Sequence, residues 1–217
     1  MSQTDSFIEE VTEEVRRDKL FRLMRKYGWI AIVLVVAIVA GASYNEWRKA
    51  RDQAEARAFG DALLGAMQNH EAKDRAARLA TISAEGDKGA VVALLLAAEA
   101  ANSGDPDTAV SALQALAADP QVSEEYRQLA RFKLVLLQAD GLDPAERLAR
   151  LQPLAAPGAP FRLLAEEQMA IAEIDSGNAA AAIERLQALL ADQEVTPGLR
   201  RRVSQLIVAL GGELEPA

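Results

Sequence analysis

The sequence contains no cysteine, a single histidine and few aromatic residues. The absence of cysteine excludes disulfides, thiol nucleophiles and thiolate metal sites. His70 stands in the polar stretch NHEAKD, where no cysteine or second histidine accompanies it, so we interpret it as a solvated turn residue. A glycine-rich phosphate loop is also lacking. We therefore expect a protein that is not an enzyme and that uses no cofactor and no metal.

Strand-forming residues are scarce outside one segment of the chain. Aromatic residues make up 5% of the sequence, and alanine and leucine supply most of its apolar half. Alanine and leucine have high helix propensity, whereas β-branched and aromatic residues favour strands, so the composition predicts an all-α fold. The net charge of −8 argues against nucleic acid as the main partner, because phosphate binding requires a basic face.

One long segment, residues 27–45, carries no charge between Lys26 and Glu46. At about 1.5 Å per residue a helix of this length spans roughly 28 Å, close to the thickness of a hydrocarbon core. A single helix satisfies its own backbone in lipid and a lone strand does not. The segment therefore predicts one transmembrane helix in contact with membrane lipid.

Aromatic residues bracket this segment as interfacial belts do. Tyr27 and Trp29 stand at one end, and Tyr44 and Trp47 stand at the other. The alternative is a cleaved signal peptide, for which residues 40–42 (Ala-Gly-Ala) resemble a cleavage site. The long preceding segment and the length of the apolar run favour an uncleaved anchor.

The basic residues that flank the segment predict its orientation. Six precede it and four follow it, and the positive-inside rule then favours a cytoplasmic N-terminus. These residues are Arg16, Arg17, Lys19, Arg22, Arg25 and Lys26 before the segment, and Arg48, Lys49, Arg51 and Arg57 after it. The C-terminal domain would lie outside the cytoplasm, which is the periplasm if the source is a Gram-negative bacterium.

Residues 1–26 form a charged amphipathic segment in which acidic residues come first and basic residues later. This order complements a helix dipole. A helix that lies on anionic lipid through its basic half is one interpretation. A docking helix for a cytoplasmic partner is the other.

Three stretches of residues 46–217 align without gaps, which predicts helical repeats. They begin at Asp105, Asp143 and Asn178, with spacings of 38 and 35 residues. Each starts with a helix-capping residue, and proline follows in two of them. Leucine recurs eight and eleven residues after each start. These leucines are Leu113, Leu116, Leu151, Leu154, Leu186 and Leu189.

A small residue in the second helix of a unit allows its two helices to approach closely. Ala109 and Ala182 hold this position in two units, and Arg147 holds it in the third. A preceding helix ends near a glycine in each unit, at Gly104, Gly141 and Gly177. The predicted unit is therefore helix, glycine turn, capped helix.

Helices are also expected on both sides of these units. Residues 46–68 and 71–84 would form a first, degenerate pair. Thr196 and Pro197 would start a terminal capping helix, with Leu199 and Val203 facing inward and Arg200–Arg202 facing solvent.

The stretch GDPDTAVSALQALAADP, which starts at Gly104, resembles the second half of a tetratricopeptide repeat (TPR). The whole arrangement resembles the YfgM-like family, the ancillary subunits of the bacterial SecYEG translocon. The shared features are the acidic-then-basic N-terminus, the KYG motif at Lys26–Gly28, one span and an aromatic exit at Trp47. The resemblance implies a bacterial inner-membrane protein with a periplasmic TPR domain near the translocon and periplasmic chaperones.

Three charged residues are candidates for a partner-binding groove. Glu99 lies within LLLAAEAA and would either line a groove or reach solvent at a helix edge. Arg127 and Arg131 would form a positive groove wall or a solvated face. The sequence leaves both choices open.

We expect, in all, a single transmembrane helix followed by a TPR-like solenoid at residues 46–217. Its expected function is non-catalytic binding of protein partners, through the surface that a solenoid offers to peptides or helices. The alternative is a structural tether that forms homodimers in another membrane assembly.

Overall fold

The computed structural model describes the backbone of residues 3–214 and the side chains of Phe21, residues 24–30 and residues 32–214. Every regular element within residues 3–214 is helical, which confirms the predicted all-α class. The chain divides after Asp61 into two compact units. The sequence-based domain boundary at residue 46 stays a prediction.

The described part of the first unit is the larger portion of helix α1 (Gln3–Met67), whose residues after Asp61 belong to the second unit. Residues 24–67 are the part of α1 long and apolar enough to cross a membrane, with a mean hydropathy of 2.0 in the most apolar window and none of that window buried. The predicted segment 27–45 lies inside this range. The side chains on which the two interpretations of residues 1–26 depend lie mostly outside the described residues.

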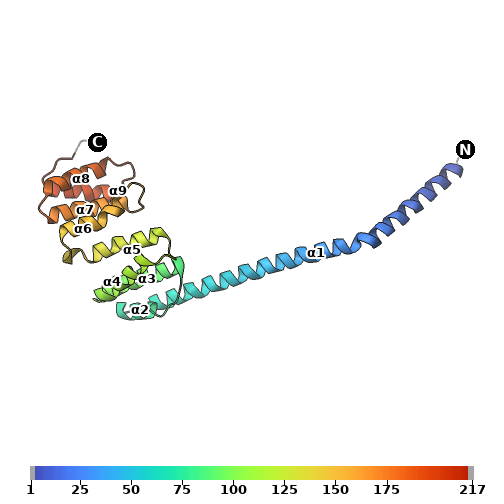
Figure 1. Ribbon diagram of the computed structural model, residues 1–217, viewed down its shortest axis with the longest axis horizontal. Helices are drawn as coiled ribbons and strands as arrows, with labels where there is room; N and C mark the ends of the chain where they lie inside the picture. Colours follow the sequence, from blue (N-terminus) through green and yellow to red (C-terminus); the bar gives the residue numbers. More distant parts are fainter. Residues whose placement is uncertain (1–2, 215–217) are drawn as a thin grey trace. The chain divides into compact units, whose positions relative to one another are not determined.

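The second unit is a succession of short helices that follow one another in chain order (Figure 1). Helices α3 and α4, and helices α7 and α8, pack against each other as pairs, and each second helix packs against the first helix of the next pair. The helices are α2 (Ala72–Leu79), α3 (Gly86–Asn102), α4 (Pro106–Ala118), α5 (Glu124–Leu137), α6 (Pro144–Leu151), α7 (Arg162–Asp175), α8 (Ala179–Ala191) and α9 (Pro197–Ala209), with 3₁₀ turns at Ala139–Gly141 and Gln152–Ala155.

The predicted caps begin the second helices. The Asp105 carboxylate accepts a hydrogen bond from the Thr108 N–H, and Asn178 accepts one from the Ala181 N–H. Asp143 does the same for Ala145. Each side chain satisfies one of the backbone donors that a helix start leaves without an intrahelical partner.

The repeat leucines form the core, as the alignment predicts. Leu113, Leu151 and Leu186 are almost completely buried, and so are the leucines three residues after each of them. They belong to three successive apolar clusters along the unit. The register of the three repeats is therefore confirmed.

The middle pair departs from the other two. Helices α5 and α6 pack against each other much less than α3 packs against α4 or α7 against α8. Arg147 holds the position of Ala109 and Ala182, and a guanidinium there prevents the close approach that alanine allows. The turn differs too. Gly104 and Gly177 adopt the left-handed φ of 79°, whereas Gly141 lies in a 3₁₀ turn and does not.

The predicted first pair is not formed in the expected way. Helix α2 ends at Leu79, not at residue 84, and its packing partner is α3. Leu79 is the buried side chain of this eight-residue helix, so α2 has a single anchoring residue at its C-terminal end.

Candidate partner groove

An apolar groove of about 690 Å³ lies across the first helices α5, α7 and α9 of the second unit. Its apolar lining includes Leu136 on α5 and Leu164 on α7, which are 40% and 36% exposed. Among the described residues 68–214, the other exposed large hydrophobics are Val208 and Leu214. The full lining is Phe132, Leu136, Leu164, Glu167, Gln168, Ile171, Arg202, Gln205, Leu206 and Ala209.

Helix α7 contributes one stripe of residues to the groove, beside the face that it buries in the core. Its core face contains Ala165, Met169 and Ala170, which are buried. Its groove residues recur at i, i+3, i+4 and i+7, the spacing of one helical stripe. They are Leu164, Glu167, Gln168 and Ile171. Leu164 and Ile171 are the two apolar residues of this stripe, and their spacing of seven residues can be read in the sequence.

Two charged side chains lie in the groove, and they bind each other. Arg202 donates from Nε to Glu167 Oε1 at 2.7 Å and from Nη2 to Oε2 at 2.8 Å. This bond ties α9 to α7 and raises the pKa of Arg202. Arg202 is exposed, as the sequence predicts for the solvated face of the last helix, and its bond to Glu167 also places it at the groove, which the sequence did not predict. Arg201 is exposed as expected.

The α5 wall of the groove is held by an aromatic contact. The ring of Phe132 stacks on that of Phe161, which immediately precedes α7, with centroids 6.1 Å apart and planes 8° apart. Stacked rings of this kind add to the apolar area they bury. Phe132 itself is buried, so it supports the wall, while Leu136 one turn later forms the accessible surface.

Glu99 is buried on α3 and is bound by Arg75 of α2. The sequence had left open whether it lines a groove or reaches solvent at a helix edge. The Arg75 Nη2 atom lies 2.7 Å from Glu99 Oε2. Arg75 also donates to the carbonyl oxygens of Asn69 and His70. The pair thus fastens α2 and the preceding turn to α3, and Glu99 is not part of the α5–α7–α9 groove lining.

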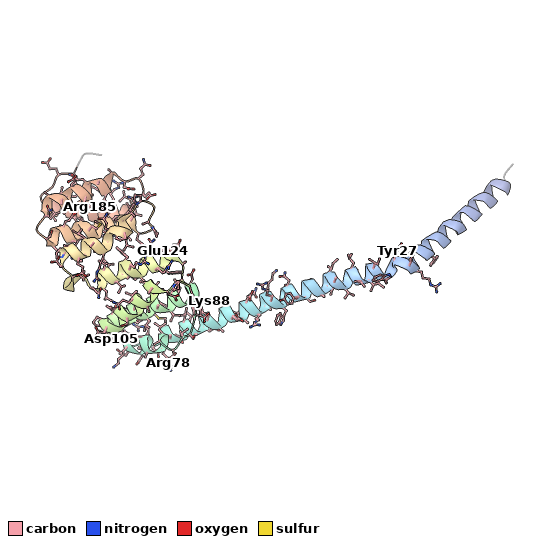
Figure 2. The ribbon with its side chains drawn as sticks, in the orientation of Figure 1. Tyr27, Arg78, Lys88, Asp105, Glu124 and Arg185 are labelled. Carbon is pink, nitrogen blue, oxygen red and sulfur yellow. The ribbon has the colours of Figure 1, made fainter. Side chains whose placement is uncertain are left out.

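Arg127 and Arg131 lie together on α5, and Glu124 binds both of them. Their nitrogens are 2.7 and 3.0 Å from the Glu124 oxygens, and Figure 2 labels Glu124 near the start of α5. Hydrogen bonding by Gln128, with help from the two arginines, holds the pKa of Glu124 below its usual value. Neither arginine lines the apolar groove. A role for them in partner capture stays a prediction.

A second, polar cleft of about 540 Å³ lies between α7 and α8. Arg185, labelled in Figure 2, binds Glu173 and Glu166 there, and Arg162 binds Asp192 and Glu194. The arginines of this cleft are already satisfied within the domain. Its ion pairs therefore link α7 to α8 and to the residues that follow α8.

The four aromatic residues predicted at the membrane interface are exposed on α1. Their exposure ranges from 50% at Tyr27 to 64% at Tyr44. Lys26 lies 5.4 Å from the centre of the Tyr27 ring, and Tyr44 contacts Trp47. Trp29 completes the set. Their contact with lipid stays a prediction.

Residues 24–188 match a family model described as a tetratricopeptide repeat-like domain. The chain belongs to this family. The match includes the apolar part of α1 and runs through most of α8. No curated protein and no solved structure matches the chain. Because TPR-like domains typically mediate protein–protein interactions, the family agrees with the expectation of an interaction module.

Proposed function

We propose that this TPR-like protein is a non-catalytic, membrane-anchored subunit that binds protein partners of bacterial secretion through its α5–α7–α9 groove. The partners are components of the Sec translocon and periplasmic chaperones. In this proposal α1 spans the inner membrane with its N-terminus in the cytoplasm, and the TPR-like domain lies in the periplasm.

The groove is the observation that carries the proposal. Leu136 and Leu164 expose apolar surface on two neighbouring helices, and burial of such surface against a partner is favourable. A groove between helices suits an amphipathic helix, which inserts side chains at i, i+3, i+4 and i+7. The link to secretion is supported by the resemblance of the whole arrangement to YfgM-like subunits.

A photo-crosslinking amino acid at position 168 tests the proposal. Gln168 lines the groove, and Glu184 on α8 lies outside it and provides a matched control position. Illumination of intact membranes should link the residue-168 variant to translocon subunits or periplasmic chaperones, identified by mass spectrometry. Crosslinks to unrelated proteins only, or equal crosslinks from position 184, would contradict it.

The orientation has its own test, which uses the lack of cysteine in the chain. Ser6→Cys and Glu184→Cys each introduce one thiol, and a membrane-impermeant maleimide reports its side of the membrane. Glu184→Cys should be labelled in intact spheroplasts, and Ser6→Cys only after lysis. The reverse pattern would overturn the orientation. A mature N-terminus near Ser43 would identify a cleaved signal peptide instead of an anchor.

A further inference from the structure

The groove has no net charge, because its one cation and its one anion neutralise each other. Arg202 and Glu167 form a two-point bond that uses both oxygens of the carboxylate. Glu167 is only 7% exposed, whereas Arg202 is 54% exposed at the side chain. The remaining polar lining residues, Gln168 and Gln205, carry no charge.

Without Glu167, Arg202 would be well suited to bind an acidic ligand. A guanidinium forms paired hydrogen bonds with a carboxylate, either of a side chain or of a chain terminus. In this groove Glu167 already occupies that geometry. The Nη1 edge of Arg202 stays accessible, because Glu167 takes bonds only from Nε and Nη2. A ligand carboxylate at that edge would lie beside the negative charge of Glu167, which offsets most of the attraction of the guanidinium.

We propose that the groove binds the uncharged apolar face of a partner helix, and that Glu167 is the specificity-determining residue that excludes acidic ligands. This inference rests on the proposed function. The choice of occupant follows from complementarity: an apolar, neutral surface with two amides fits leucine-like side chains beside neutral polar ones. A volume of about 690 Å³ accommodates several side chains of one helical face.

Two blocked, fluorescein-labelled peptides of fourteen residues test the inference against the full chain in detergent. The first is an alanine- and glutamine-based helix with leucines at i, i+3, i+4 and i+7. The second has glutamate in place of one central leucine. Fluorescence anisotropy should show that the wild-type protein binds the leucine peptide at least tenfold more tightly.

Glu167→Gln should release Arg202 and improve the affinity for the glutamate peptide by about tenfold. Because the new contact is ionic and partly exposed, the gain should shrink at high salt. Glu166→Gln is the matched control: this neighbouring acid on α7 binds Arg185 outside the groove, so its loss should leave the discrimination unchanged. The double variant Glu167→Gln/Arg202→Gln should lose the gain, because no cation remains.

The outcomes separate this inference from the proposed function. The inference is overturned if the wild type binds both peptides equally, or if Glu167→Gln leaves the ratio of the two affinities unchanged. Crosslinking at position 168 tests the proposed function independently of either result. Should Glu167→Gln fold poorly in a thermal melt, Glu167→Met takes its place, because it also frees Arg202 and leaves no buried charge. It should show the same gain for the glutamate peptide, and an unchanged ratio would contradict us. A dimer that Leu164→Glu abolishes would show that a second copy fills the groove, which also overturns it.

Discussion

Arg147 on α6 binds Asp175 on α7, at the point where the other two repeats place an alanine. The arginine is 7% exposed at the side chain and the aspartate 48%, so the pair reaches from the interior to the surface. In the middle repeat α6 is therefore fastened forward to α7 more firmly than back to α5.

This relationship predicts an asymmetric response to mutation. Asp175→Ala leaves a buried guanidinium without its partner, and we expect a loss of about 1–3 kcal/mol in the free energy of unfolding. Arg147→Met replaces the charge with an apolar chain of similar length and should cost less. Chemical denaturation of both variants and the double variant measures the difference. Equal losses in the two single variants would contradict the assigned burial of Arg147.

The two left-handed glycines should tolerate alanine poorly. Gly104→Ala or Gly177→Ala forces a side chain into a φ of 79°, which costs roughly 1–2 kcal/mol. Gly141→Ala is the matched control, because its φ is not in that region and no atom lies within 4 Å of the added Cβ. It should be neutral or slightly stabilising. Thermal melts of the three variants compare their stabilities directly. If Gly141→Ala lowers the melting temperature as much as Gly104→Ala does, the left-handed φ is not the cause of the loss.

Leu186 tests the repeat register. It is completely buried in the cluster that α8 forms with α7 and α9, so Leu186→Ala should reduce the free energy of unfolding by about 2–5 kcal/mol. Val208→Ala on the exposed face of α9 serves as the control and should change it by no more than about 0.5 kcal/mol. A variant at Leu186 that unfolds at the wild-type denaturant concentration would show that the core is elsewhere.

The sequence predicted the repeats well because their signals are local. Caps such as Asp105 and leucines such as Leu113 act within one helix or one helix pair, so their spacing carries the information. The weak packing between α5 and α6 agrees with the presence of Arg147 where the other two repeats have alanine. The partner of Glu99 was not predictable in this way, since Arg75 lies in another helix and only the fold brings the two together.

The α7 side of the groove could have been predicted from the sequence, whereas the pairing of its two charged residues could not. Leu164 and Ile171 lie on one face of α7, and their spacing of seven residues is visible in the sequence. By contrast, nothing in the run Arg200–Arg202 distinguishes the arginine that binds Glu167, 35 residues earlier, from its neighbours. Long-range pairing depends on how the helices stack, and the local pattern does not encode it.

Low pH should weaken the domain through its ionised carboxylates. Hydrogen bonds from Thr108 hold the pKa of Asp105 below its usual 3.8, and Arg162 does the same for Asp192. A lowered folded-state pKa stabilises the fold above the unfolded value and loses that contribution as pH falls through the folded value. The melting temperature should therefore be level from pH 7 to about 5 and fall below about pH 4.

Asp105→Asn isolates one of these groups. Asparagine caps a helix about as well as aspartate, so stability at pH 7 should change little. The decline below pH 4 should become shallower, because one titrating carboxylate is gone. A decline identical to that of the wild type would show that Asp105 is not ionised through a fold-specific contact.

The central claim is that the α5–α7–α9 groove captures the partners of this protein, and a charge placed on its surface tests it most directly. Leu164→Glu puts a carboxylate on an exposed groove residue, and Val208→Glu makes the same change on α9 outside the groove. Both should melt within a few degrees of the wild type. The measurement is quantitative recovery of translocon subunits and periplasmic chaperones with each tagged full-length chain from solubilised membranes. We predict that Leu164→Glu recovers less than about a tenth of the wild-type amount of partner, while Val208→Glu recovers nearly all of it. A folded Leu164→Glu variant that recovers the wild-type amount would contradict the account.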